Sequence, residues 1–203
     1  MRKINKLAAL PHFNGNNYNN DCRIWSEKSG HISFHGKYKN IFIETRLQIL
    51  IEEQFQQCGY TEIYIDNEEE CHIDHYLKQE HNQNSIFDWN NLIVATKDNS
   101  FGANYKDNTY KINRNEYTLI FNPIIDNVEN NFHYDELGMI REDLNKVKKT
   151  VEVFNLNVKY LRDRRKKIIT LIDEFKNGGL SANDIKSTLK DYGFKSVVEQ
   201  YCI

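Results

Sequence analysis

Hydrophobic residues recur along this chain with two different spacings. Between residues 41 and 57 the apolar side chains mostly follow one another at steps of three and four, which predicts an amphipathic helix. The spacing then shortens: Ile63 and Ile65 alternate with polar neighbours, and a polar turn at residues 66–68 leads to a new apolar stretch at residues 71–73. Alternation on both sides of a turn predicts a β-hairpin.

A further apolar run, residues 92–95, predicts another strand, and residues 101–106 predict the start of a helix. Two strands, a loop and a helix in this order form a ββα unit. Residues 1–40, by contrast, contain Asn, Gly and Ser at short intervals and no sustained period. Irregular segments and short strands are therefore expected there.

The last third of the chain is predicted to be helical. Apolar positions from Leu144 to Phe154 mark one helix, and those from Val158 to Phe175 mark a second. Gly178-Gly179 is expected to end the second helix. The sequence Ser181-Ala182-Asn183-Asp184 is typical of a capping box, and it predicts a last helix that runs through Tyr192.

These elements predict an α/β chain of the α+β type in three regions: an irregular N-terminal segment (1–40), a core that holds the ββα unit (41–140) and a C-terminal helical region (141–203). A chain of 203 residues is long enough for one domain with a helical appendage. No stretch approaches the roughly 18 apolar residues of a membrane span, and the N-terminal apolar run is too short for a secretory signal. The four cysteines lack a paired spacing, so we expect a reduced, cytoplasmic protein without membrane association.

The net charge of −2 does not by itself indicate a nucleic-acid-binding protein, so any such affinity must come from a local patch. Residues 159–167 form the one dense basic cluster, and within it Arg162, Arg165 and Lys166 are the predicted phosphate contacts. For the outward residues a solvated helix face is an equally good interpretation. Arg165 lies in the apolar stripe of its helix, and we expect it to point toward substrate or a carboxylate.

The residues with the most specific chemistry lie beside the predicted strands. Cleavage of a phosphodiester needs a base that deprotonates water and a cation that neutralises charge on the leaving oxygen. His75 suits the base, Asp74 suits a ligand for a hard cation such as magnesium, and Asn91 suits a residue that pins the loop and orients the histidine. Strict alternation would send Asp74 and His75 to opposite faces, so the strand is expected to end or bulge there.

At these residues the chain resembles the HNH endonucleases, and in particular the HNH nuclease subunit of Septu-type and retron-associated anti-phage systems. The family's first motif, Ile-Asp-His followed by an aromatic residue, matches Ile73-Asp74-His75-Tyr76. Its second motif, Phe-Asp-Trp-x-Asn-Leu, matches residues 87–92 in full. The resemblance covers about residues 45–170, and the combination of motifs is specific although each piece alone is weak.

Two departures from the family pattern concern metal binding. Members usually carry two Cys-x-x-Cys knuckles for a structural zinc, but here the first reads Cys58-Gly59-Tyr60-Thr61 and the second has no cysteine, so no structural zinc is expected. The family's third motif, Cys-x-x-Cys-Asn-x-x-Lys, is best laid over residues 99–106, which puts Ala103 at the Asn position. Asn104 or Asn99 would then complete the metal site, and Lys106 would contact nucleic acid.

The resemblance implies a ββα-metal core that hydrolyses phosphodiester bonds in DNA, with RNA as the alternative substrate, using Mg²⁺ or Mn²⁺. It also implies an ABC-type ATPase as partner, and a retron reverse transcriptase with its RNA/DNA product as a further one. Two other interpretations stay open: a catalytically degenerate subunit that binds nucleic acid or the partner without cutting, and a structural adaptor. The retained Asp74-His75 pair favours the nuclease over both.

Overall fold

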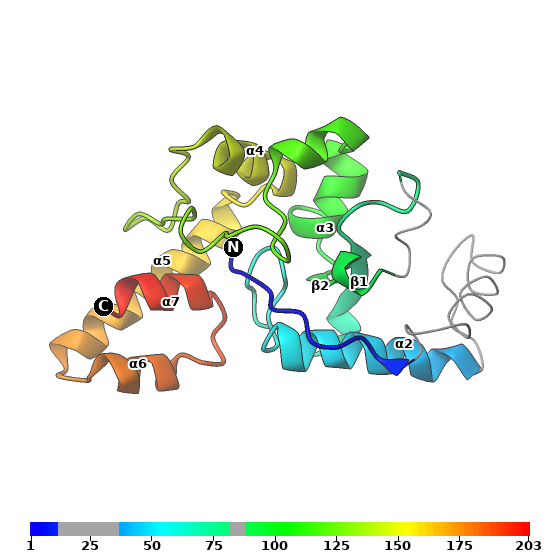
Figure 1. Ribbon diagram of the computed structural model, residues 1–203. Coiled ribbons are helices and arrows are strands. Elements are labelled where there is room, and N and C mark those ends of the chain that lie inside the picture. Colours follow the sequence, from blue (N-terminus) through cyan, green and yellow to red (C-terminus); the bar gives the residue numbers. More distant parts are fainter. Residues whose placement is uncertain (12–36, 82–87) are drawn as a thin grey trace.

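The computed structural model of the chain describes residues 1–11, 37–81 and 88–203. Over these ranges it is a mixed α+β structure, built mainly of helices around a small two-stranded antiparallel sheet (Figure 1). None of the helices in these ranges has the length and apolar character that crossing a membrane requires. Most of the N-terminal region predicted to be irregular, and Phe87 of the second motif, lie outside the described residues.

The helix that precedes the sheet consists of α2 (Lys37–Leu47) and a following stretch of π-helix, η2 (Gln48–Glu53). Periodicity predicts this helix over residues 41–57, so its existence is confirmed while both of its ends lie earlier in the chain. The early end has a backbone cause, because Phe55 and Gln56 both adopt left-handed conformations with φ of 53° and 56°. Buried side chains of η2 pack toward the strand β2 (Leu92–Thr96).

The first strand of the sheet, β1 (Cys71–His75), pairs with β2, and Asp74 stands opposite Ile93. The predicted hairpin is therefore wrong, since residues 63–65 form no strand and Tyr64 makes only an isolated bridge with Gln57. The backbone of this segment bonds instead to the turn before it, and the Ile65 N–H donates to the Gln56 carbonyl over 2.7 Å. Between this segment and β1 lies an exposed 3₁₀-helix, η3 (Glu68–Glu70).

The edge of β2 that faces away from β1 is covered by other parts of the chain. The Gln54 side-chain amide donates to the Val94 carbonyl over 2.8 Å, and its oxygen accepts from the Val94 N–H over 2.9 Å. The Gly59 N–H donates to the same carbonyl over 3.0 Å. The Lys6 ammonium donates to the Leu92 carbonyl over 3.2 Å. The outward-facing backbone groups of Leu92 and Val94 are thus used within the molecule.

Short helical segments precede and follow β2 in the chain. The 3₁₀-helix η5 (Trp89–Asn91) leads into the strand, and after it the chain enters α3 (Gly102–Asn104) and η6 (Tyr105–Tyr110), which confirms the predicted helix start. Figure 1 shows α3 next to the two strands, with α4 (Asn145–Phe154) on the side away from α2. The helix α4 packs on η6 and on the 3₁₀-helix η7 (Arg114–Leu119).

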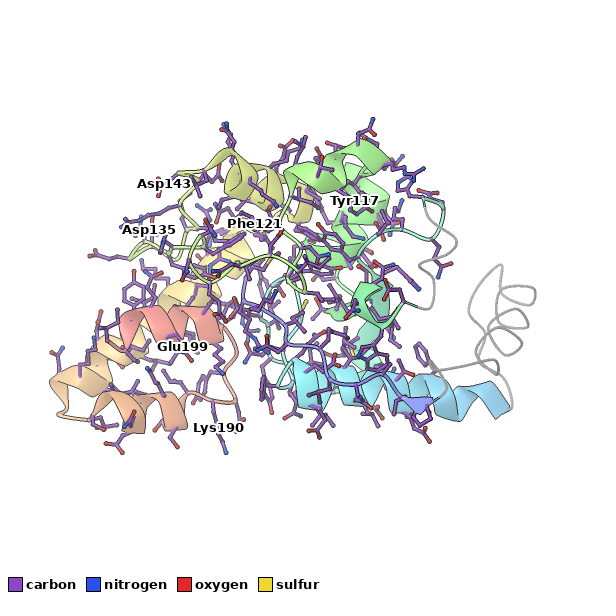
Figure 2. The ribbon with its side chains drawn as sticks, in the orientation of Figure 1. Tyr117, Phe121, Asp135, Asp143, Lys190 and Glu199 are labelled. Atoms are coloured by element: carbon purple, nitrogen blue, oxygen red, sulfur yellow. The ribbon has the colours of Figure 1, made fainter. Side chains whose placement is uncertain are left out.

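The C-terminal region contains a long helix, α5 (Lys159–Asn177), and two short ones, α6 (Ala182–Thr188) and α7 (Lys195–Tyr201). The capping box at Ser181 is present, but α6 ends before Tyr192. The sequence pattern did not predict α7, because seven residues are too few to establish a helical period. In Figure 2, Lys190 and Glu199 mark the lobe formed by these helices, well apart from Tyr117 of η7.

Candidate active site

The carboxyl end of β1 opens onto a surface cavity of about 370 Å³. Six of its lining residues come from β1 and the turn that leaves it, and one comes from η6. The lining residues are Ile73, Asp74, His75, Lys78, Gln79, Glu80 and Asp107. Both residues of the predicted Asp-His pair therefore face one cavity. The strand was expected to end or bulge at this pair, but Asp74 and His75 are both still paired with β2, and the strand ends directly after His75.

Asp74 is held in place by Tyr60, a residue that was not predicted to belong to the site. The Tyr60 hydroxyl, which is fully buried, donates to Oδ2 of Asp74 over 2.5 Å. The Tyr60 ring stacks on Phe154 of α4 with ring centroids 4.5 Å apart. Burial, followed by the nearby Asp74 carboxylate, raises the pKa of Tyr60 well above its usual value, so this hydroxyl stays protonated and can only donate to the carboxylate.

His75 is the last residue of β1 and is 8% exposed. The side-chain amide of Gln79 lies 3.2 Å from Nδ1 and 3.4 Å from Nε2 of the imidazole. Gln79 also lines the cavity, so the ring and the amide share its wall. An imidazole at the edge of an open cavity is placed to exchange a proton with a water molecule there.

Asn91 fixes the turn that follows His75. Its Oδ1 accepts from the Leu77 N–H over 2.7 Å, and its Nδ2 donates to the Leu77 carbonyl over 3.0 Å. Its backbone carbonyl accepts from the Tyr76 N–H over 2.9 Å. These three bonds tie the end of η5 to the two residues directly after His75, and they restrict the backbone that carries the imidazole.

Lys106 was predicted to contact nucleic acid, and the structure contradicts this role. Its side chain is 0% exposed, and its ammonium lies 3.3 Å from Oδ2 of Asp74 and 3.0 Å from Oδ1 of Asp107. It also donates to the backbone carbonyls of His75 and Tyr76 over 3.2 and 3.3 Å. Burial by itself would lower the pKa of Lys106, but the two carboxylates raise it above the ordinary value, so the group stays charged.

Asp107 is a site residue that sequence reasoning missed. It follows Lys106 in η6 and reaches the cavity, while Lys106 points into the protein. Burial, and then repulsion by the Asp74 carboxylate, raise the pKa of Asp107 to about 6 despite the opposing effect of Lys106. The only sequence signal was its position next to the lysine of the third motif.

The two predicted asparagine ligands lie elsewhere. Asn99 is exposed in the loop between β2 and α3, and Asn104 in α3 donates its side-chain amide to the Lys97 carbonyl over 2.9 Å. Neither belongs to the lining of the cavity that holds Asp74 and His75. In the structure, Asp107 lines the cavity beside Asp74 and His75, where Asn104 or Asn99 was expected.

Arg165 was expected to reach substrate or a carboxylate, and this expectation is wrong. It is 2% exposed, and its Nε donates to the Gly138 carbonyl over 2.6 Å. A terminal nitrogen donates to the Leu156 carbonyl over 2.9 Å. The guanidinium thus joins two backbone segments, at Gly138 and Leu156, to α5 inside the protein. Of the other predicted phosphate contacts, Arg162 is half-buried and Lys166 is exposed on α5.

The charges around the cavity favour an added cation. Among the described residues, no group of three or more His, Cys, Asp and Glu side chains is arranged to hold a metal ion. The charged groups at the cavity are the carboxylates of Asp74, Asp107 and Glu80, and the ammonium groups of Lys106 and Lys78, of which Lys78 pairs with Glu80 over 3.0 Å. Their formal charges sum to −1. Carboxylate oxygens beside open solvent fit a hard cation such as Mg²⁺, which keeps several of its waters.

No family model matches this chain, and no protein in the curated set matches it.

Proposed function

We propose that this protein is a metal-dependent endonuclease that hydrolyses phosphodiester bonds in nucleic acid, with DNA as the favoured substrate. The observation that carries the proposal is the convergence of His75, Asp74 and Asp107 on one open cavity at the end of β1. A base beside two carboxylates is the set of groups that metal-assisted attack of water on a phosphodiester requires. The order of two strands and a helical segment supports a ββα core of the HNH type.

Each polar residue at the cavity then has a distinct role. His75 accepts a proton from the attacking water, and Gln79 restrains the imidazole. Asn91 fixes the turn behind His75. Asp74 and Asp107 would hold a Mg²⁺ or Mn²⁺ ion, which supplies positive charge for the leaving oxygen. Lys78 lies at the rim, where it suits contact with a backbone phosphate.

Cleavage of plasmid DNA and of RNA with Mg²⁺ or Mn²⁺ tests this function. The wild-type chain is compared with His75→Ala, each alone and together with any co-encoded ABC-type ATPase. We expect His75→Ala to lower the cleavage rate by at least about 100-fold, the usual contribution of a general base. His133→Ala is the matched control, since His133 is exposed and lies outside this cavity. Equal cleavage by wild-type protein and His75→Ala would reject the proposed role of His75.

One observation favours a second candidate function, a subunit that binds nucleic acid or a partner without cutting. The Lys106 ammonium already lies between the two carboxylates and offsets half of their charge. If this second function is correct, the wild-type chain would bind an oligonucleotide or the ATPase. It would cleave neither DNA nor RNA, whether the ATPase is present or not. The cleavage assay therefore separates the two candidates.

A further inference from the structure

The surroundings of the Lys106 ammonium resemble those of a bound metal ion. Four oxygens lie within 3.3 Å of it: one carboxylate oxygen each from Asp74 and Asp107, and the backbone carbonyls of His75 and Tyr76. Hard cations in proteins are bound by shells of this kind, made only of oxygen. The side chain is fully buried, so water does not compete for these contacts.

The position of Lys106 in the chain keeps it in this shell. Its backbone carbonyl accepts from the Ile112 N–H over 3.1 Å, which anchors the end of η6. The side chain leaves the helix toward the protein interior, while that of Asp107 leaves toward the cavity. A cation that enters from solvent therefore meets the outer face of the carboxylates, with the ammonium behind them.

We propose that Lys106 is a built-in cation that holds Asp74 and Asp107 together in the metal-free protein and weakens the binding of a divalent ion at their outer face. Lys106 is thus a positioning residue. Without its charge, two carboxylates would face each other inside the protein with no cation between them. With it, the pocket is formed in advance, and the same charge repels an incoming ion. This inference rests on the proposed function for the class of ligand, a divalent cation.

The test replaces the ammonium by a side chain of similar length without charge. Thermal unfolding of wild-type protein and Lys106→Met is followed with EDTA and with excess Mn²⁺. With EDTA we expect the variant to unfold about 10 °C lower, because a buried charge pair has lost one partner. We expect Mn²⁺ to raise the unfolding temperature of the variant by several degrees more than that of the wild type. Equal shifts in the two proteins would overturn the inference.

A second variant covers the case in which Lys106→Met does not fold. Asp107→Asn leaves the ammonium with one carboxylate, so its charge is balanced without a metal ion. Binding of Mn²⁺, measured by electron paramagnetic resonance, is expected to weaken at least about tenfold while the unfolding temperature in EDTA is kept or raised. Unchanged Mn²⁺ affinity in Asp107→Asn would contradict the assignment of this pocket.

These measurements do not depend on catalysis. If Mn²⁺ binds as described and the wild-type chain cuts no nucleic acid, the inference stands and the nuclease function fails. If cleavage depends on His75 but Lys106→Met responds to Mn²⁺ as the wild type does, the function stands and the inference fails.

Discussion

At the scale of single residues, Tyr60 fixes the orientation of Asp74, although no pattern in the sequence predicted a role for it at the site. Its ring is anchored on Phe154 of α4, and its hydroxyl meets the carboxylate at 2.5 Å. The turn that contains it, Cys58-Gly59-Tyr60-Thr61, is the stretch that the sequence resemblance would align with a zinc knuckle. In this chain the turn contributes a hydrogen bond to the site.

Removal of that hydroxyl is expected to destabilise the protein. In Tyr60→Phe the ring stack is kept and one buried hydrogen bond to a carboxylate is lost, which costs about 1–3 kcal/mol of unfolding free energy. Urea denaturation measures the loss. Tyr192→Phe serves as control, because Tyr192 is 48% exposed and should tolerate the same change within about 0.5 kcal/mol. Equal stability of the two variants would show that the Tyr60 hydroxyl contributes little.

Some of the site was predictable from sequence and some was not. Asp74, His75 and Asn91 carry local signatures, and the structure brings the first two to one cavity while Asn91 binds the adjoining turn. Tyr60 and Asp107 reach the site only through tertiary packing, which no local pattern encodes. The predicted contact of Lys106 with nucleic acid was wrong. A lysine beside a motif suggests a cation at the surface, whereas in the structure its ammonium is buried between two carboxylates.

At the scale of elements, periodicity predicted the long helices and the strand at residues 92–95. It failed at the proposed hairpin, where Ile63 and Ile65 alternate as a strand would. Their side chains are buried, yet their backbone bonds to the preceding turn, and β1 finds its partner after a connection that includes η5. Alternation reports which side chains are buried and leaves the pairing partner undetermined.

The hydrogen bonds of Asn91 form a clamp between η5 and the turn after β1, and this clamp leads to a prediction at the scale of elements. Asn91→Ala removes two side-chain hydrogen bonds to Leu77, so the turn behind His75 should open more often. We expect a loss of about 1–3 kcal/mol in unfolding free energy and faster amide hydrogen exchange at Tyr76 and Leu77. Asn90→Ala is the matched control, since the neighbouring Asn90 is exposed. Unchanged exchange at Leu77 in Asn91→Ala would contradict the clamp.

At the scale of the whole molecule, Glu62 joins the two ends of the chain. Its carboxylate lies 2.9 Å from the N-terminal ammonium of Met1 and accepts from the Ser196 N–H of α7 over 2.8 Å. The C-terminal helices are thereby fastened to the segment that carries Tyr60. Contacts of this range, between residues 134 positions apart, cannot be inferred from a single sequence.

The charge of Glu62 makes stability depend on pH. Burial alone would raise its pKa, but the N-terminal ammonium and Ser196 lower it from 4.5 to about 2. Because the pKa of Glu62 in the folded state lies below the unfolded value, its stabilising contribution is lost as the pH falls from about 4.5 toward 2. Burial lowers the pKa of the Met1 ammonium from its ordinary value of 8.0, so the ion pair also weakens as the pH rises and this group loses its proton.

We therefore expect Glu62→Gln to lower the unfolding free energy by about 3 kcal/mol at pH 7. The difference from wild type should narrow as the pH is reduced from 5 toward 3, as measured by urea denaturation at each pH. Glu199→Gln, at an exposed carboxylate of α7, should match the wild type throughout. A difference for Glu62→Gln that does not change with pH would mean that the carboxylate acts through shape and not through charge.

The side-chain amide of Gln54 at the edge of β2 affects how copies of the protein can associate. An open strand edge is a template on which a strand of another molecule can grow the sheet. Here the Val94 N–H and carbonyl are already bonded to Gln54, and Leu92 is bonded to Lys6. Another molecule therefore cannot add a strand at Leu92 and Val94 without displacing these bonds, and along this edge the protein resists fibril-like growth.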